Sequence, residues 1–504
     1  MKKLLSMFLV SVMGVTALSG CGTKQEEGEM KVKIAVYDRG AISASEGSME
    51  DNRWTKWINE NCGVDVEFLA FNRNQYDEKL NAMLASGNAP DVFIGYSGDW
   101  MAQLVEQGVL KPVDEMIDKY STSYKKYLEE NPQLKKYTTF DGSSYAFTSQ
   151  RPETSILNYG AWIRQDWLDK LGLEMPQTDE ELLDVLRAFR DKDPNGNGEK
   201  DEVPMSLIWT QLVECMYKSM DQWYLNEDGV LEFAQLTDRN MEALRFMKTC
   251  YDEGLIHKEF ATDTQYTIQD QQWVTGKTGV YMRQWNFDCT ELMKNDPTAN
   301  IVPLPMVSTK FGKAGYYEEA DANLFCMINA DSKADKAIVK FMDWLIEGNW
   351  FTLMNGEEGV HYEMVNGVPK IKDIEKRKTE VGYAGAYALI TDEKVDPESF
   401  VLKAADDEIS QKFALMQKNA FEQYSKNNKF ERDIPRSPQV PEYASLFSVW
   451  SKKRDELRIR VITGGAEATP EWGIEQLRNE WKLLGGEEMN KQVNEWYKEN
   501  KDNF

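Results

Sequence analysis

The sequence predicts an α/β protein whose sheets are mostly parallel and covered by helices. Apolar, strand-like runs alternate with amphipathic helical stretches over residues 32–110, and the connections between them are short. The chain has 504 residues, enough for two or three ordinary domains or one large two-lobed domain. A hydrophobic fraction of 41% can fill a large core, so the protein does not belong to the disordered class.

The N-terminal residues have the composition of an export signal. Two lysines precede an apolar run over residues 4–18, shorter than the roughly 20 residues that a membrane-spanning helix needs. The run ends in LSGC, which resembles the bacterial lipobox, in which the cysteine receives a diacylglycerol and becomes the new N-terminus. We therefore expect residues 1–20 to be a signal peptide, Cys21 to carry the lipid, and residues 21–30 to be a polar tether at the extracytoplasmic face of the cell membrane. The alternative is an ordinary signal peptide with a chance cysteine.

The first structural unit is expected to contain three strands and three helices. The strands are expected at 32–38, 64–71 and 89–96, and the helices at about 50–60, 74–86 and 99–107. Ligands gather at the carboxyl ends of strands in parallel sheets. The residues expected at such ends are Tyr37 to Arg39 after the first strand and Tyr96 to Asp99 after the third.

The next part of the chain continues the alternation. A strand over 144–148 leaves the first unit, and a helix within 159–173 is expected to end at Gly172. A second region of strands and helices then extends to about residue 318 and includes a strand over 279–282. No repeat of 20–50 residues is visible, which argues against a solenoid or propeller.

Charge, histidine and cysteine content exclude several function classes. The 59 Lys and Arg against 84 Asp and Glu give a net charge of −25, which argues against a nucleic-acid-binding surface. The two histidines, His257 and His361, lie in no catalytic or zinc-binding pattern, so we expect no enzyme active site. Besides Cys21, five cysteines occur without CxxC spacing, so neither a disulfide framework nor a zinc ribbon is indicated, although a single bridge is possible.

The segment DPNGNGEKDE at 193–202 has the spacing of a calcium-binding loop. Oxygen-bearing side chains at alternate positions can wrap a cation, and Gly198 permits the tight turn behind them. The candidate ligands are the side chains of Asp193, Asn195, Asn197, Asp201 and Glu202 and the backbone carbonyl of Glu199. A complete EF-hand would have glutamate at position twelve, where this chain has Pro204. We expect a structural Ca²⁺ here, and the alternative is a solvated turn.

Aromatic residues indicate a carbohydrate ligand. The fifteen tryptophans are roughly twice the expected number. Trp209, Trp285 and Tyr362 lie beside polar residues near predicted strand ends. A flat ring matches the apolar face of a sugar while polar neighbours match its hydroxyl rim. The alternative for each is a half-buried core aromatic.

The order of these motifs resembles the extracellular solute-binding proteins of ABC transporters, specifically the long lipoproteins that take up oligosaccharides. The matching stretches are LSGC at 18–21, NAMLASGNAPDVFIG at 81–95, WIRQDWLDKLGLEMPQTDEEL at 162–182, DPNGNGEKDEVP at 193–204, GKTGVYMRQW at 276–285, GEEGVHYEM at 356–364 and EWKLLGGEEMNKQVNEWY at 480–497. They occur in order along nearly the whole chain after the signal peptide.

The resemblance implies a two-lobed periplasmic-binding-protein fold of type II, with a hinge of crossing segments and no catalytic residues. The first lobe would comprise residues 31–148 and about 319–378, and the second about 149–318 and 379–504, with the calcium loop. It also implies a monomer that closes on an oligosaccharide and delivers it to a membrane permease. Carried over from the family, the sugar contacts would be Asp38, Arg39, Tyr96, Asp99, Trp209 and Trp285.

One departure from the family and two alternatives bear on this interpretation. Ser97 and Gly98 after Tyr96 are small where some relatives have tryptophan, which puts in doubt a strong stacking platform on the first lobe. The alternatives are a peptide-binding or sensory receptor of the same fold, and a secreted glycan-degrading enzyme. A receptor would use charged rather than aromatic contacts, and an enzyme would release shortened products.

Overall fold

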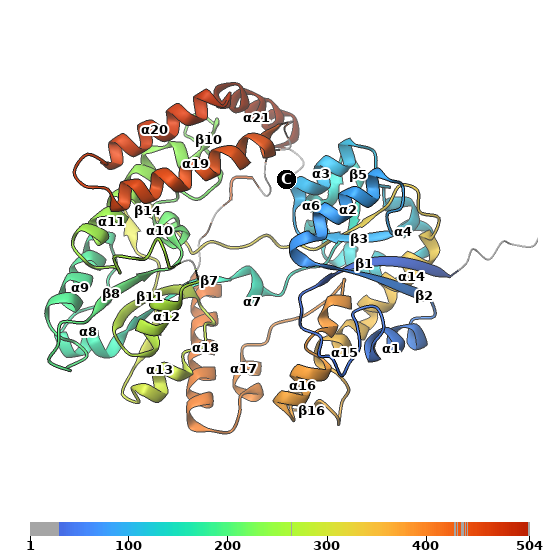
Figure 1. Ribbon diagram of the computed structural model, residues 1–504, viewed down its shortest axis with the longest axis horizontal. Helices are drawn as coiled ribbons and strands as arrows, with labels where there is room; N and C mark the ends of the chain where they lie inside the picture. The colour runs from blue at the N-terminus through green and yellow to red at the C-terminus, as the bar shows by residue number, and fades with distance from the viewer. Residues whose placement is uncertain are drawn as a thin grey trace, which may run out of the picture.

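The computed structural model describes residues 30–501 except 264, 428, 429, 431, 435–437, 439 and 441. It has two αβ lobes joined by crossing segments, and a helical C-terminal unit lies on the second lobe (Figure 1). The predicted two-lobed α/β fold is thus confirmed. Cys21 and the predicted signal peptide lie outside the described residues.

A five-stranded sheet with the order β2-β1-β3-β15-β6 forms the centre of the first lobe. Its strands are β1 (Lys31–Asp38), β2 (Asp65–Asn72), β3 (Val92–Gly95), β6 (Ala146–Phe147) and β15 (Phe325–Ile328). The first three are parallel and correspond to the strands expected from the sequence. β15 is antiparallel to both of its neighbours, so the sheet is mixed. β15 directly follows a segment that crosses between the lobes, so it begins at the edge of the sheet where β1 and β3 end. It therefore runs in the direction opposite to these strands.

Helices cover both faces of this sheet (Figure 1). They are α1 (Arg53–Asn61), α2 (Tyr76–Ala85), α3 (Gly98–Glu106), α4 (Asp114–Tyr120), α5 (Ser123–Glu130), α6 (Lys135–Thr138), α14 (Asp335–Trp344), α15 (Trp350–Asn355) and α16 (Ile374–Glu380). Three begin at side-chain caps: Asn52 accepts from the amides of Trp54 and Thr55, Ser97 from that of Trp100, and Asp373 from that of Lys376. The hairpin of β16 (Tyr362–Val365) and β17 (Val368–Ile371) lies between α15 and α16 along the chain.

The sheet of the second lobe has the order β12-β7-β11-β8. Its strands are β7 (Tyr159–Arg164), β8 (Val203–Leu207), β11 (Thr278–Gln284) and β12 (Ile301–Pro303). β11 is parallel to β8 but antiparallel to β7, and β12 is antiparallel to β7. The expectation of a mostly parallel sheet is wrong for this lobe. Like β15, β7 follows a crossing segment, and it therefore starts at the edge where β11 ends.

The helices of this lobe include the predicted helix that ends at Gly172, which has φ of 65°. The set is α8 (Gln165–Leu171), α9 (Asp179–Asp191), α10 (Thr210–Met216), α11 (Asp238–Asp252), α12 (Thr267–Val274), α13 (Thr290–Asn295), α17 (Glu398–Lys403) and α18 (Glu408–Asn427). α17 and α18 follow the first-lobe segment that ends near residue 390, so the chain crosses between the lobes a third time.

The C-terminal unit has an aromatic core of its own. The hairpin β9 (Trp223–Leu225) and β10 (Leu231–Phe233) packs with α19 (Tyr443–Thr463), α20 (Pro470–Leu483) and α21 (Gly486–Asn500). The ring centroid of Phe233 lies 5.2 Å from that of Trp450 and 5.3 Å from that of Trp481. Much of the tryptophan surplus is core material, because six tryptophans are less than 2% exposed: Trp54, Trp162, Trp167, Trp273, Trp285 and Trp450.

The cores place the end of the first lobe later than predicted. The predicted boundary at 378 and 379 falls inside the first core, which continues through Val381, Tyr387 and Ile390.

The five cysteines are buried and free, so the possible bridge does not form: Cys62, Cys215, Cys250, Cys289 and Cys326. None of the helices within the described part of the chain is both long enough and apolar enough to cross a membrane.

Candidate ligand-binding cleft

The carboxyl ends of the parallel strands of the two lobes face each other. β1 runs towards the second lobe, and β3 is parallel to it (Figure 1). In the second lobe, Gln284 at the end of β11 pairs with Tyr159, the first residue after a crossing segment. The edges at which αβ proteins bind ligands thus lie on either side of the hinge.

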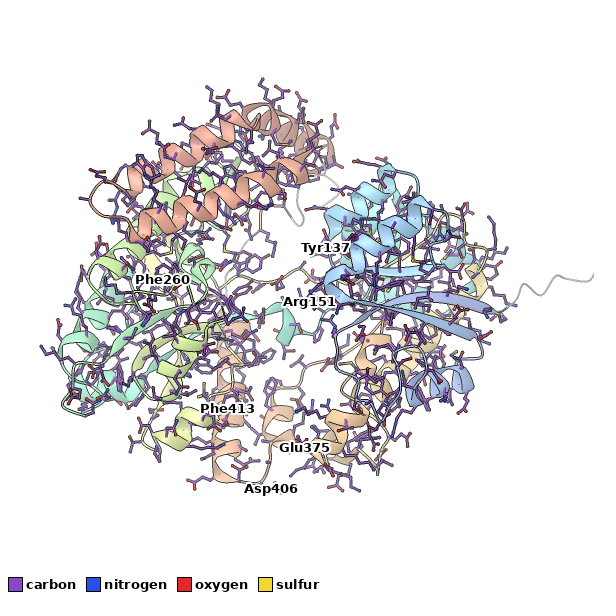
Figure 2. All side chains as sticks on the ribbon, in the orientation of Figure 1. Tyr137, Arg151, Phe260, Glu375, Asp406 and Phe413 are labelled. Atoms are coloured by element: carbon purple, nitrogen blue, oxygen red, sulfur yellow. The ribbon has the colours of Figure 1, made fainter. Side chains whose placement is uncertain are left out.

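Two of the three crossing segments, 148–158 and 317–324, hydrogen bond to each other. The amide of Arg151 donates to the carbonyl of Asp321 at 2.7 Å, and the hydroxyl of Thr148 donates to the carbonyl of Leu324 at 2.7 Å. The Arg151 guanidinium lies 3.5 Å from the Glu319 carboxylate. Figure 2 shows Arg151 between the lobes, with Tyr137 at the adjacent edge of the first lobe. This pairing lets the two segments bend together.

A further contact between the lobes lies on the side opposite the C-terminal unit. Lys370 of β17 forms an ion pair of 2.7 Å with Asp406, which precedes α18 (Figure 2). On the other side, α21 faces the first lobe across a cavity of about 830 Å³ that is lined by Glu106, Lys136 and Trp496.

Predicted site residues of the first lobe surround a pocket of about 260 Å³. Arg39 and Tyr96 line it together with Tyr37, and Tyr383 closes its far side. The rings of Tyr37 and Tyr96 are stacked with their centroids 5.4 Å apart and their planes 11° apart. Tyr37 is buried, and burial raises the pKa of its phenol well above the usual value. Tyr96 is 38% exposed and thus presents a ring surface to a ligand.

Two arginines flank this tyrosine pair. Arg39 donates to the Tyr96 hydroxyl at 2.8 Å, and its guanidinium carbon lies 5.8 Å from the ring centroid of Tyr96. The guanidinium carbon of Arg73 lies 5.5 Å from the same centroid. Arg73 was not among the predicted site residues, although its position directly after β2 places it at the carboxyl end of a strand.

The two predicted acidic residues of this lobe have different surroundings. Asp38 accepts the amide of Gly40 at 2.8 Å, so its carboxylate stabilises the turn after β1. Asp99 lies in the first turn of α3 and outside the pocket lining. Burial raises the pKa of the Asp99 carboxyl. The pocket therefore brings Arg39 and Tyr96 together, whereas neither Asp38 nor Asp99 lines it.

The facing edge of the second lobe presents an aromatic group. Trp209 follows β8 and is half-buried, and its ring centroid lies 5.2 Å from that of Tyr159. Tyr317, from a crossing segment, lies 5.2 Å from Tyr159 on another side. Tyr159 and Tyr317 were not among the predicted site residues. Both residues lie in or next to a crossing segment, and this position could have identified them as candidate contacts.

The structure does not bring Trp285 and Tyr362 to the cleft. Trp285 is 1% exposed, and its ring packs 5.6 Å from that of Phe421 and 5.8 Å from that of Phe400. Tyr362 is 7% exposed and packs 5.8 Å from Phe351 within the hairpin region. The core alternative holds for both residues, because α17 and α18 cover the ring of Trp285 and α15 contacts that of Tyr362.

The motif GEEGVHYEM builds a turn around a buried histidine. His361 is fully buried, and its Nδ1 accepts the amide of Glu357 at 3.0 Å. Its Nε2 lies 3.0 Å from a carboxylate oxygen of Glu380. Gly356 has φ of 83°, and a Cβ there would lie 2.6 Å from the imidazole. The role of this histidine is therefore to hold the turn against α16.

The predicted calcium loop is folded around its first aspartate. The Asp193 carboxylate accepts the amides of Gly196 at 2.8 Å and Gly198 at 3.0 Å. The side-chain oxygen of Asn197 accepts the amide of Glu199 at 2.7 Å. The side-chain amides of Asn195 and Asn197 donate in turn to the Asp201 carboxylate, so the candidate ligands of the loop are gathered around one another.

Glu202 provides the strongest structural evidence for a cation. Both of its carboxylate oxygens are buried without a hydrogen-bond partner among the described residues. Burial, with added repulsion from Asp193 and Asp201, raises the pKa of the Glu202 carboxyl. Asp201 is paired with Lys277 at 2.7 Å. Within the described chain, no three His, Cys, Asp or Glu residues lie close enough together to form a metal cluster. Carboxylates alone therefore do not make a Ca²⁺ site here. The site fits Ca²⁺ only when the side-chain oxygens of Asn195 and Asn197 and the backbone carbonyl of Glu199 complete the coordination.

Comparison with known proteins places this architecture in a family. The profile described as bacterial extracellular solute-binding protein matches residues 48–347. The fructooligosaccharide ABC transporter substrate-binding protein FusA of Streptococcus pneumoniae is 28% identical over 64% of this chain and 66% of its own length. Lipoprotein LipO of Bacillus subtilis is 23% identical over 99% of both chains. The polygalacturonan/rhamnogalacturonan-binding protein YtcQ of the same bacterium is 26% identical over 71% of this chain and 73% of its own.

Solved structures have the same fold. FusA of S. pneumoniae in complex with kestose superposes with a TM-score of 0.69 at 21% identity, over 94% of this chain and 100% of that one. The alginate-binding protein AlgQ2 gives 0.68 at 19% identity over the same shares. FusA and YtcQ are named as binding proteins rather than as enzymes. The profile match, over more than half of the sequence, shows that this chain belongs to the bacterial extracellular solute-binding protein family.

Proposed function

We propose that this protein is the substrate-binding lipoprotein of an ABC importer and captures an extracellular oligosaccharide between its lobes. The observation that carries the proposal is the pairing of two edges across a hinge, with Tyr96 and Arg39 on one edge and Trp209 and Tyr159 on the other. Rings with polar neighbours fit the apolar face and hydroxyl rim of a sugar. The names of FusA and YtcQ, one a fructooligosaccharide binder and one a pectin-type binder, support this ligand class.

The mechanism is binding without chemistry. A ligand first contacts one lobe, and contacts with the second lobe are made only in the closed state, so the ligand stabilises closure. The paired crossing segments near Arg151 and Asp321 allow this motion while they keep the lobes in register. The closed, loaded protein then docks on the permease, which reopens the lobes.

The N-terminal lipid would keep the protein at the extracytoplasmic face of the membrane. Diacylglycerol on Cys21, after the signal peptide, supplies two acyl chains, and two lipid signals are what stable anchoring needs. The name of LipO supports lipidation in a relative that matches along its whole length.

The loop at 193–202 would hold one structural Ca²⁺. Asp193, Asn195, Asn197, Asp201 and Glu202 would supply side-chain oxygens and Glu199 its carbonyl. Ion binding would remove the penalty of the buried, unpartnered Glu202 carboxylate. Added Ca²⁺ should raise the melting temperature of the wild type and leave that of Glu202→Gln unchanged. An equal increase in both proteins would contradict the proposal.

The function is tested with the chain from residue 22, which contains every described residue but lacks Cys21. Tryptophan fluorescence and calorimetry would follow titration with oligosaccharides from plant, host and algal sources and with peptides as controls. We expect saturable binding of a sugar that is recovered intact. A response to peptides alone would favour the receptor alternative, and shortened sugars would show an enzyme.

A further inference from the structure

We propose that the first-lobe pocket binds the carboxylate of a uronic acid, so that the transported ligand is an acidic oligosaccharide. This inference rests on the proposed function and specifies the substrate class of the same cleft. It comes from the two arginines beside the Tyr37 and Tyr96 stack, Arg39 and Arg73.

Neither guanidinium is neutralised by the protein. No described carboxylate lies within ion-pair distance of Arg39 or Arg73. Several other arginines do have carboxylate partners: Arg53 pairs with Glu46 at 2.6 Å, and Arg187 pairs with Glu253 at 2.7 Å. Arg239 and Arg377 have no ion pair among the described residues either, so the missing partner is informative only together with the position of Arg39 in the pocket lining.

The tyrosine pair lies within reach of both cations, Arg39 in the lining of the pocket and Arg73 next to the same rings but outside the lining. The guanidinium carbon of Arg39 lies 5.6 Å from the ring centroid of Tyr37, and that of Arg73 lies 5.8 Å from it. Each is also within cation–π distance of the exposed Tyr96 ring. An arginine that is already positioned loses less side-chain entropy when it binds a ligand.

Nearby acids do not pair with these guanidiniums. Asp38 accepts the Gly40 amide at 2.8 Å, which commits one of its oxygens to the turn. Asp77 lies close enough to the tyrosine pair to raise the pKa of the Tyr37 phenol. Among the described residues, however, no ion pair joins it to Arg39 or Arg73, so both guanidiniums remain available to a ligand anion.

The geometry favours a carboxylate carried by a sugar ring. A pocket of about 260 Å³ is slightly smaller than the roughly 300 Å³ at which drug-sized sites begin, so it suits one sugar residue of a longer chain. A guanidinium has five N–H donors in a planar fork that matches a planar carboxylate. Arg39 uses one of them on Tyr96, and the other donors remain for a ligand. Sugars can also carry a sulfate ester, which is anionic but tetrahedral, so the test must distinguish a sulfated sugar from a uronate.

The first experiment compares charged and uncharged forms of one sugar by calorimetry on the chain from residue 22. The probes are trimers of galacturonate, mannuronate and guluronate, an aldouronic acid from glucuronoxylan, and the methyl esters of the galacturonate trimer. Kestose, maltotriose and a sulfated galactan trimer complete the panel. We expect one uronate to bind at least about tenfold more tightly than its ester, a difference of 1.4 kcal/mol, and this preference to decrease at high salt.

The second experiment uses Arg39→Gln and Arg73→Gln with Arg460→Gln as a matched control. Arg460 is also an exposed guanidinium over an aromatic ring, 4.7 Å from Trp472, but it lies on α19 in the C-terminal unit. Each cleft variant should reduce the preference for acid over ester at least about threefold, and the double variant should abolish it. The control should keep the wild-type preference, and melting temperatures should show that all variants fold.

The outcomes separate this inference from the function on which it rests. Tight binding of a neutral or only a sulfated sugar would overturn the uronate assignment and leave the oligosaccharide function intact. A uronate preference that survives in the double variant would also overturn the assignment to Arg39 and Arg73. Binding of no saccharide in the panel would contradict both proposals.

Discussion

Replacing Trp285 with alanine should destabilise the second lobe and leave ligand binding largely intact. Its indole is 1% exposed and lies between the rings of Phe400 and Phe421, with centroids 5.8 Å and 5.6 Å away. Gly160 approaches from the other side, because a Cβ there would lie 2.8 Å from the Trp285 Cβ. The substitution therefore leaves a cavity in a closely packed layer.

The expected loss of unfolding free energy is about 3–5 kcal/mol, the usual cost of truncating a buried aromatic residue to alanine. No hydrogen bond is lost, since the indole N–H of Trp285 has no partner among the described residues. Trp285→Phe should therefore cost much less, about 1 kcal/mol, because it keeps a ring and removes an unpaired buried donor.

The assay is urea unfolding followed by circular dichroism, together with calorimetric titration of the bound sugar. Tyr96→Ala is the matched comparison, because Tyr96 is 38% exposed and lies in the proposed site. It should change stability by less than about 1 kcal/mol and weaken binding at least about tenfold. The reasoning would be refuted if Trp285→Ala left stability unchanged and lowered affinity tenfold, since Trp285 would then be a ligand contact.

Three other predictions test packing, a helix cap and the cation loop. Gly279→Ala should cost about 1–3 kcal/mol in urea unfolding, because its Cβ would overlap the ring of Phe189, whereas Gly465→Ala, with open space around it, should cost little. Asp343→Ala should cost about 2 kcal/mol, because this buried carboxylate accepts the amides that begin α5 at 2.8 and 2.9 Å; an unchanged urea midpoint would contradict this. The raised pKa of Glu202 means that, without Ca²⁺, ionisation with rising pH destabilises the fold, while Ca²⁺ needs the ionised form. The increase in melting temperature caused by Ca²⁺ should therefore shrink as pH falls from 7 towards 5, and an increase that is independent of pH would count against Glu202 as a ligand.

Local sequence patterns predicted the parts of this protein that depend on neighbours in the chain. The strands β1, β2 and β3, the end of α8 at Gly172, and the position of Arg39 and Tyr96 after strands follow from short apolar runs and their stop signals. The folding of the loop around Asp193 is equally local, because hydrogen bonds within a few residues form it.

Strand direction was not predictable in this way. β7 and β15 have the same apolar character as the parallel strands, but both follow crossing segments. The edge of the sheet at which each strand begins fixes its direction, and that edge is set by where the hinge lies. The end of the first lobe at Ile390 likewise depends on which core the segment joins.

The sequence by itself determined that the chain forms αβ units, that candidate contacts follow strands, and that a loop suited to a cation lies at 193–202. Only the tertiary structure decided which aromatic residues are available to a ligand. Trp285 and Tyr96 both follow strands, yet α17 and α18 bury the first and leave the second exposed. Arg73 joins Arg39 only because β1 and β2 are neighbours in the sheet. Burial and pairing across elements depend on segments distant in the sequence, so no local pattern encodes them.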